Sequence, residues 1–451
     1  MRKSCCLVKR VNFSINKDNM NVNMYTKEST GVTGSNRLYT IYYAALLLLT
    51  FFLSKPNAAY STVFRYAYMI AVVAPLFVNR SYITFALTLF LGISQASFVP
   101  LLPTTSTYFL VLAVALSFIQ VHITQNVLWY ILGILYILCI ELFSMNPYFE
   151  CVIWATIAVL LSFSVNTIHD IKRMGLGFTL VSLVLCVLFL MYFDEFSDTY
   201  ASIGYEEVER SSWINANVFG GVIGCGMTSA VFLLVSSKEW LANGWNKFIC
   251  VVVLLLSIVV LILNASRGAL SASVISSTIL LLSSKIKKKY LLLIFLGLAI
   301  FVLILYNVGY FELLELRTLG EDNTTDTAGG RTEIWEAKLN AFANLPILQQ
   351  LFGVGYDDCV NLGIYFDTHN DLVTALCGYG YVGFISFIAL LVAPVFVARP
   401  DKRIVIIGLL VFLILECVVL SPILRGYFIF FIFYIMIVKY ALITKNRQDY
   451  V

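Results

Sequence analysis

Residues 329–383 read GGRTEIWEAKLNAFANLPILQQLFGVGYDDCVNLGIYFDTHNDLVTALCGYGYVG. This stretch is the longest polar interruption in a chain that is otherwise mostly apolar, and it carries Arg331 and His369. The chain is 60% hydrophobic and 12% charged, whereas soluble domains carry roughly 25% charged residues. Apolar runs of about 20 residues, the length that crosses a bilayer, recur on both sides of the stretch. We therefore expect any chemistry to be located in this connection between membrane segments.

The apolar runs predict an all-α, polytopic membrane protein with about 12–14 transmembrane helices, because a spanning segment must satisfy its own backbone hydrogen bonds. The runs lie at residues 38–53, 63–78, 82–100, 107–123, 127–144, 150–166, 176–193, 215–236, 247–264, 269–284, 290–308, 372–397, 404–420 and 427–441. The alternating pattern of an outer-membrane barrel is absent from the sequence.

These runs divide the chain into six parts. They are a polar cytoplasmic tail at 1–37, N-terminal transmembrane helices at 38–193, a periplasmic loop at 194–214, transmembrane helices at 215–308, a large periplasmic loop at 309–371, and C-terminal transmembrane helices at 372–445. Within the large loop, Ile334, Leu339 and Phe342 recur at nearly helical spacing. This spacing predicts a short helix lying at the membrane surface.

The distribution of charge predicts the orientation. If the N-terminus is cytoplasmic, 22 of the 30 lysines and arginines fall on the cytoplasmic side, including the KIKKK cluster at 285–289. Eighteen of the 26 acidic residues then fall on the outer side. An excess of positive charge on the cytoplasmic side is what sets membrane topology. Both termini are therefore expected in the cytoplasm, and the loop at 309–371 in the periplasm.

Arginine is conspicuous on the acidic outer side, where it makes up six of the eight basic residues. Its planar guanidinium suits phosphate oxygens. Arg267 lies at the outer end of a span, where a charge is costly and often functional, although a snorkelling side chain would look the same. Arg331 follows two glycines at the start of the expected loop helix, a place that favours anions, unless it is a solvated loop charge. Arg210 and Arg425 are two further candidates by side and charge alone.

His369 precedes the span at 372–397 and is the one histidine expected on the outer side. An imidazole can act as a general base near neutral pH, but a single histidine is more often structural. Two acids within spans, Glu141 and Glu416, leave open a path for ions and hence a transporter. The adjacent Asp357 and Asp358 are weak evidence for a metal. No P-loop, GxSxG or HExxH motif occurs in the sequence.

The ten cysteines give no sign of a disulfide framework or a metal site. Most lie inside apolar runs, and no CxxC pair occurs. Cys359 and Cys377 lie in or beside the large loop. We interpret all of them as small apolar side chains.

Several motifs taken together resemble the shared domain of bacterial O-antigen ligases and O-antigen polymerases. They are INAN at 214–217, SRGAL at 266–270, GRxxIW at 330–335, a leucine-rich stretch ending in GVGY at 356, THNDLV at 368–373 and GYGYVGF at 378–384. The resemblance covers roughly residues 210–390. This chain departs from it at Gly378, where many relatives carry an acidic or polar residue, which leaves the acceptor side less defined.

The resemblance implies a metal-independent membrane glycosyltransferase, without cofactor or nucleic-acid partner, that acts on undecaprenyl-diphosphate-linked sugars at the periplasmic face of the inner membrane. Arg267 and Arg331 match the arginines taken to hold the diphosphate, and His369 matches the histidine taken to activate the acceptor hydroxyl. A chain-length regulator is a partner implied by the family alone.

We expect a polymerase that joins lipid-linked repeat units of O-antigen or a related surface polysaccharide. The alternative is a ligase that transfers the finished glycan to lipid A–core. A lipid-linked sugar flippase or transporter is a third class, which would require a charged central cavity.

Overall fold

The structure is a computed structural model that describes residues 33–54, 60–78, 82–96, 162, 164–193, 216–236, 244–284, 286–311, 314, 331–424 and 427–446. Most of these residues are helical, and no strand occurs among them. The predicted all-α fold is therefore confirmed. The spans expected at 107–123 and 127–144, most of the span at 150–166 and the loop at 194–214 lie outside the described residues.

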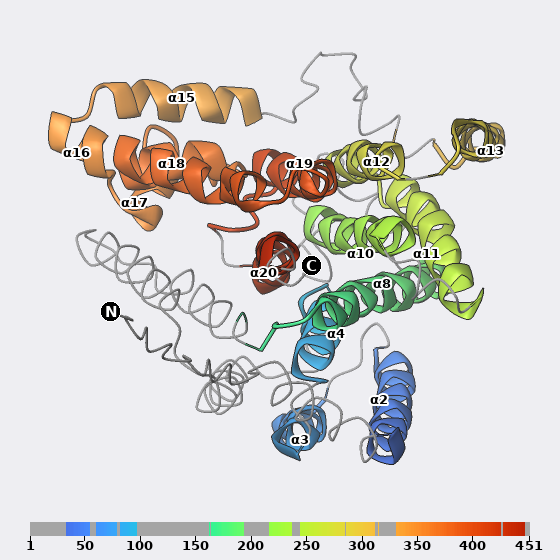
Figure 1. Ribbon diagram of the computed structural model, residues 1–451. Helices are drawn as coiled ribbons and strands as arrows, with labels where there is room; N and C mark the ends of the chain where they lie inside the picture. The colour runs from blue at the N-terminus through green and yellow to red at the C-terminus, as the bar shows by residue number, and fades with distance from the viewer. Residues whose placement is uncertain are drawn as a thin grey trace, which may run out of the picture. The chain divides into compact units, whose positions relative to one another are not determined.

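The chain forms two units, residues 1–50 and residues 51–451. Helix α2 (Thr33–Leu53) occupies the described part of the first unit. In the second unit the long helices are α3 (Thr62–Val78), α4 (Ile83–Ala96), α8 (Ile168–Met191), α10 (Ala216–Ser236), α11 (Gly244–Leu263), α12 (Arg267–Leu282), α13 (Lys288–Asn307), α18 (Asp371–Val397), α19 (Arg403–Val419) and α20 (Phe428–Asn446). Among the described residues that follow α13 and precede α18 in the chain, the shorter helices are α15 (Arg331–Ala343), α16 (Ile347–Phe352) and α17 (Tyr356–Asn361), which lie beside α18 (Figure 1).

Five of the described helices are long and apolar enough to cross a membrane, namely α8, α10, α11, α13 and α18. Four others, α2, α3, α12 and α20, contain shorter apolar segments. The protein is thus an all-α polytopic membrane protein. Each expected span that falls on described residues corresponds to a helix, with ends that differ by a few residues.

The largest difference in a helix end is in α8, which begins at Ile168 rather than at residue 176. The side chain of Thr167 accepts a hydrogen bond from the backbone N–H of Asp170, and the Asp170 carboxylate accepts one from the backbone N–H of Thr167 at 2.9 Å. This capping box satisfies N–H groups that the first helical turn leaves without partners. The polar residues that made residues 168–175 look like a loop are therefore the residues that start the helix.

Helix α10 lies at the centre of the membrane helices and packs against α8, α11, α12, α19 and α20. Its glycines allow this close approach, as small residues do between membrane helices. A Cβ atom on Gly220 would lie 2.4 Å from the Ser266 hydroxyl, and one on Gly224 would lie 2.6 Å from a ring carbon of Phe412. The helices that carry Arg267 and Val419 are thereby held against one scaffold.

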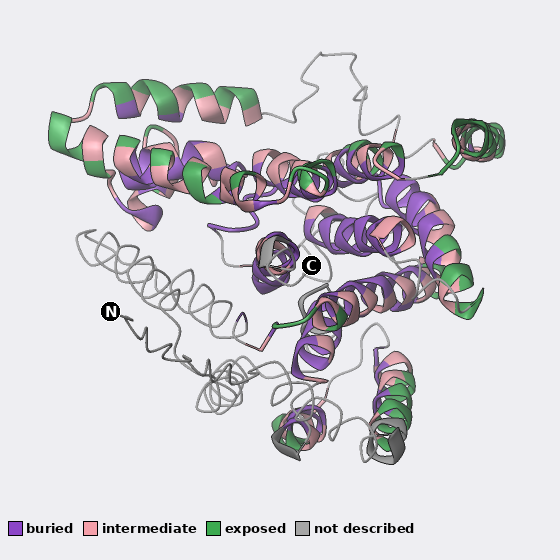
Figure 2. Ribbon diagram, in the orientation of Figure 1, coloured by how far each residue is buried: buried purple, intermediate pink, exposed green. Residues whose placement is uncertain are grey.

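Helix α13 contrasts with α10 in its burial (Figure 2). Within α13, Leu305 is the one buried residue. In α10, by contrast, almost every residue of the apolar part is buried. Helix α13 is apolar throughout, so an exposed surface of this kind is suited to lipid.

Candidate active site

Helix α15 is the organising element of the candidate site. The prediction of a helix here is confirmed. Phe342 is buried, whereas Leu339 is 39% exposed. Arg331, Trp335 and Lys338 form a nitrogen-bearing stripe on one side of the helix, because residues four and three positions apart stack.

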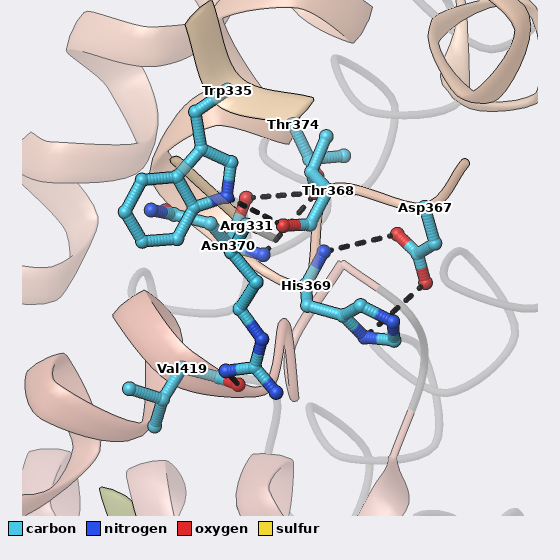
Figure 3. A network of polar contacts seen from close by, with 8 residues as sticks. All are labelled: Arg331, Trp335, Asp367, Thr368, His369, Asn370, Thr374 and Val419. Atoms are coloured by element: carbon cyan, nitrogen blue, oxygen red, sulfur yellow. Dashed lines mark hydrogen bonds and ion pairs between the residues drawn. The ribbon is translucent and has the colours of Figure 1, made fainter. Parts of the chain in front are cut away.

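The three nitrogen-bearing side chains of this stripe each bind backbone carbonyl groups from other parts of the chain. Nη1 of Arg331 donates to the carbonyl oxygen of Val419 at 2.8 Å, and Nε1 of Trp335 donates to that of Thr368 at 2.7 Å (Figure 3). Lys338 donates to a further group of carbonyls at the end of α17 and just after it. One helix therefore fixes the end of α19 and the loop before α18 at the same time.

Arg331 is well matched to its partner. Val419 is the last residue of α19, so its carbonyl oxygen has no acceptor role within the helix. The negative end of the helix dipole also favours a cation at this position. The contact therefore holds the guanidinium beside the C-terminus of α19.

Arg267 meets the same part of α19 from another direction. It is the first residue of α12, and the adjacent Gly268 packs so closely that a Cβ atom there would lie 2.6 Å from Cγ2 of Val419. Arg267 and Arg331, 64 positions apart, thus both lie next to Val419 in the structure. The start of α12 adds the positive end of its own dipole, an arrangement that suits an anion.

The turn before Arg267 explains the SRG motif in local terms. Ala265 has a φ of 50°, and the backbone N–H of Ser266 donates to the carbonyl oxygen of Leu261. This pattern ends α11 in the manner of a Schellman motif. The next helix then begins at once, so Arg267 is presented in its first turn and is partly exposed.

His369 lies in the short loop between α17 and α18, and its backbone is unusual. Its φ of 48° is one of three positive values at non-glycine residues in the described chain. Such conformations cost of order 1–3 kcal/mol and cluster at functional sites. Asn370 caps α18 by accepting from the backbone N–H groups of Leu372 and Val373 at 2.9 and 3.3 Å. The histidine is therefore held between the Trp335-bound carbonyl of Thr368 and a helix cap.

An acid accompanies the imidazole of His369. Oδ2 of Asp367 lies 3.9 Å from Nδ1 of His369, and Oδ1 of Asp367 accepts from the His369 backbone N–H at 3.3 Å. The His369 side chain is 33% exposed, so a substrate can reach it. An acid beside a histidine orients the ring and stabilises its protonated form. The sequence analysis did not select Asp367, although its place two residues before the histidine in FDTHNDLV was a signal.

Asp371 is a second acid that the sequence analysis missed. It is fully buried, and its two carboxylate oxygens accept from the backbone N–H groups of Ile423 and Leu424 at 2.9 and 3.0 Å. These bonds attach the start of α18 to the segment after α19. That segment leads to Arg425, which, like Arg210 and Glu141, lies outside the described residues.

Lys338 occupies a group of carbonyl oxygens that we call the carbonyl cage. Its Nζ donates to the carbonyl oxygens of Cys359, Val360, Leu362 and Ile364 at 2.7, 3.0, 3.3 and 3.2 Å. The side chain is completely buried. Burial lowers the pKa of the Lys338 ammonium, and nearby Cys359, Cys377 and Asp367 oppose that effect. In the sequence, Lys338 resembles any other charged residue of a polar loop, so no pattern predicted that it would be buried.

The glycine motifs GVGY and GYG form a backbone-to-backbone contact. Gly380, inside α18, has a φ of 70° and interrupts the helix. The interruption leaves carbonyl oxygens available, and those of Cys377 and Gly378 accept from the backbone N–H groups of Val354 and Gly355 at 3.3 and 2.7 Å. Glycine is needed at a position with positive φ and a close backbone neighbour. This contact holds the turn between α16 and α17 against the first half of α18.

The acids considered for other functions are separated from this site or are surrounded by helices. Glu416 is 1% exposed, within α19, and a Cβ atom on Gly221 of α10 would lie 3.1 Å from its Oε2. Burial raises the pKa of Asp357, and the neighbouring Asp358 adds to the effect. Among the described residues, no group of three or more His, Cys, Asp or Glu side chains is placed to hold a metal ion.

The fold and the site define a polytopic helical membrane protein in which a helical loop brings Arg331 to the end of α19 and His369 to the start of α18, while Arg267 begins α12. Residues 251–388 match the family model described as O-antigen ligase. This match supports, for the matched segment, the resemblance to O-antigen ligases and polymerases. It includes Arg267, Arg331 and His369, but neither the INAN stretch nor α19. No curated protein matches the chain.

Proposed function

We propose that this protein is a polymerase that transfers a growing glycan from undecaprenyl diphosphate to the nonreducing end of the next lipid-linked repeat unit. The observation that carries the proposal is the arrangement around α15. This one helix binds the end of α19 through Arg331, beside the start of α12, and binds the carbonyl next to His369 through Trp335. One helix thus places a cationic group for a leaving diphosphate beside the start of α12, which carries the second cationic group, and holds the loop of the base for an acceptor.

In the proposed reaction, the acceptor hydroxyl attacks the anomeric carbon of the lipid-linked glycan. A new C–O glycosidic bond forms while the bond from that carbon to the diphosphate oxygen breaks. Arg267, Arg331 and the N-terminus of α12 stabilise the negative charge that develops on the leaving diphosphate. Fixed cations of this kind can supply the stabilisation that a divalent metal gives elsewhere, so the reaction requires no metal.

His369 is the proposed general base. It accepts the proton of the acceptor hydroxyl as the glycosidic bond forms. The Asp367 carboxylate, 3.9 Å from Nδ1, stabilises the resulting imidazolium. The base therefore carries its own counter-charge, and the arginines remain available to the diphosphate.

The proposed location is the bacterial inner membrane, with both termini in the cytoplasm and the site on the periplasmic side. The charge distribution supports this orientation, since 22 of the 30 basic residues then fall on the cytoplasmic side. The partners are the lipid-linked donor, the glycan acceptor and membrane lipid, and a chain-length regulator would act on the polymer length. The ligase reaction is the second candidate, favoured by the description of the matching family model as O-antigen ligase.

The test is the lipopolysaccharide ladder of a deletion strain complemented with wild type, H369A, R267A or R331A. A polymerase gives core plus a single repeat unit in the deletion strain and restores the ladder only with wild type. Bare core with accumulating lipid-linked polymer would instead establish the ligase. Full complementation by H369A would remove the proposed base, and an unchanged ladder in the deletion strain would overturn a role in lipopolysaccharide.

Transport is separated from transfer by one further variant. E416Q removes the charge of an acid buried among membrane helices but leaves the site around α15 unchanged. An enzyme should retain its ladder with E416Q and lose it with R331A. The reverse pattern would favour a lipid-linked sugar transporter.

A further inference from the structure

Two cysteines from different helices meet beside the candidate site. Cys359 lies in α17 and Cys377 in the first half of α18. A Cβ atom on Gly378, the neighbour of Cys377, would lie 3.7 Å from Cβ of Cys359. The two cysteines are 1% and 0% exposed, and both belong to a buried cluster that includes Phe342 and Val373. The sequence spacing of 18 residues gave no reason to pair them, so the pairing is a result of the fold.

Backbone hydrogen bonds fix the two cysteines in this position. Gly355, one turn before Cys359, donates to the carbonyl oxygen of Gly378 at 2.7 Å and accepts from the backbone N–H of Cys359 at 3.0 Å. Val354 donates to the carbonyl oxygen of Cys377 itself at 3.3 Å. The two helices that carry the cysteines are therefore joined by backbone hydrogen bonds close to both cysteine residues.

Lys338 contacts both cysteine residues. Its ammonium donates to the carbonyl oxygen of Cys359 at 2.7 Å, and its backbone carbonyl oxygen lies 3.9 Å from the Sγ atom of Cys377. A nearby cation favours the thiolate, which is the species that attacks a disulfide. Lys338 is therefore a suitable neighbour for thiol–disulfide exchange while this part of the chain folds.

We propose that Cys359 and Cys377 form a disulfide bond in the mature protein, introduced by a thiol–disulfide oxidoreductase of the bacterial periplasm. The proposal rests on the periplasmic location of this loop in the proposed function, because disulfides form in that oxidising compartment. Both S–H bonds break and one S–S bond forms. Two electrons and two protons pass to the disulfide of the oxidoreductase, which leaves as a dithiol.

The bond would close a loop that contains the proposed base. The segment between the two cysteines includes Asp367, His369 and Asp371. Its two ends would then be joined covalently, in addition to the hydrogen bonds from Trp335 and Lys338. The disulfide therefore acts on the site by holding the loop of His369 closed.

The other described cysteines provide an internal control. Cys186, Cys225, Cys250 and Cys417 are buried within α8, α10, α11 and α19. Each of the four is carried by a different helix, and the Cys186 thiol lies 3.9 Å from the hydroxyl groups of Ser182 and Ser257. We expect these four to remain thiols in the same preparation.

The experiment uses the full chain, purified in detergent from cells quenched with acid. Free thiols are blocked with a light maleimide under denaturing conditions, the protein is reduced, and newly released thiols are labelled with a heavy maleimide before mass spectrometry. We expect heavy label on Cys359 and Cys377 and light label on Cys186 and Cys225. Without reduction, a cross-linked pair of peptides lighter by two hydrogens should appear, and it should be absent from C359S and C377S.

A second measurement separates this proposal from the proposed location and function. Asn340 is exposed on α15, and in N340C a membrane-impermeant maleimide reports whether the loop faces the periplasm. If N340C is labelled in cells with a permeable outer membrane but Cys359 and Cys377 carry light label, the disulfide proposal is overturned and the location stands. If N340C is not labelled, the location and the disulfide both fail. A cross-link in a protein whose deletion leaves every glycan unchanged would support the disulfide and overturn the transfer function.

Discussion

Asp371 and Leu424 are 53 positions apart, and the carboxylate of the first accepts a 3.0 Å hydrogen bond from the backbone N–H of the second. The other oxygen of the same carboxylate accepts from Ile423 at 2.9 Å. A buried acid thus fixes the segment after α19 against the start of α18, two residues from His369. Hydrogen bonds to a charged group contribute more than neutral ones, about 1.5–3 kcal/mol.

The first prediction concerns this carboxylate. In D371N the amide nitrogen must face a backbone N–H, so one hydrogen bond is lost and two donors are opposed. We expect glycan transfer to fall at least about tenfold, the equivalent of 1.4 kcal/mol, measured with purified enzyme and lipid-linked substrate. The control is D401N, whose side chain is 52% exposed in the connection between α18 and α19. Equal activity of D371N and D401N would contradict the role assigned to the carboxylate.

The second prediction compares two neighbouring glycines. A Cβ atom on Gly380 would lie 2.5 Å from the backbone N of Gly353, at a φ of 70°, whereas one on Gly378 would meet nothing nearer than 3.4 Å. We expect G380A to lose the contact between the GVGY turn and α18. The yield of folded protein in detergent should therefore fall. G378A should accumulate as wild type does. Size-exclusion chromatography of fluorescent fusions measures both, and a monodisperse G380A would show that the backbone contact is dispensable.

The third prediction concerns the carbonyl cage. K338M nearly keeps the length of the side chain but removes the donor shared by four carbonyl oxygens. The carbonyl oxygens of Cys359, Leu362 and Ile364 each keep a backbone N–H donor, so the main loss is that of the hydrogen bonds to the ammonium, at about 1.5–3 kcal/mol for a bond to a charged group. We expect a marked drop in the thermal midpoint for K338M. N340A, on the exposed side of the same helix, should change it little. An unchanged midpoint for K338M would mean that the ammonium does not hold the loop.

The fourth prediction separates an effect on the position of His369 from an effect on the stability of the fold. W335F retains the ring that packs in the core but loses the 2.7 Å bond to the carbonyl oxygen of Thr368. The free energy of unfolding should change by only about 1 kcal/mol. A displaced His369 should lower kcat by about 10–100-fold, because small misplacements of a reacting group are costly. W245F, at a residue that is 71% exposed, is the control, and an unchanged kcat in W335F would refute positioning through Thr368.

The fifth prediction is independence from metal. The proposed stabilisation of the diphosphate comes from Arg267 and Arg331, so extensive treatment with a chelator should leave the transfer rate of the purified protein unchanged. Loss of activity that magnesium or manganese restores would show that the arginines are not sufficient. The measurement requires substrate prepared free of divalent ions.

The membrane helices could be predicted from sequence because hydropathy depends on local composition. The start of α8 was missed because Asp170, Lys172 and Arg173 lower the hydropathy of residues that are nevertheless helical. Gly380 was missed for the opposite reason, since GYGYVGF is apolar enough to read as a continuous helix. A backbone break that exists only because another turn packs against it has no local signal.

The candidate site divides in a similar way. His369, Arg267 and Arg331 could be selected because their residue types match a chemistry and a set of motifs. The approach of Arg331 to the start of α12 could not be predicted, because it depends on Val419, 88 positions from Arg331. The burial of Lys338 could not be predicted either, because the four carbonyl oxygens that accept from its ammonium come from residues 359–364.

Helix α13, with Leu305 as its one buried residue, makes a distinct contribution to this arrangement. Each time the chain crosses a bilayer, it continues on the other side. One additional crossing therefore decides on which side of the membrane every later loop lies. Apart from Leu305, the residues of α13 are exposed or half-buried. In the proposed topology, Arg331 and His369 would lie on the same side of the membrane as the lysine cluster at 285–289 without that crossing. Natural selection should therefore preserve the length and the hydrophobicity of this helix, whereas the identity of each apolar residue in it should be free to vary.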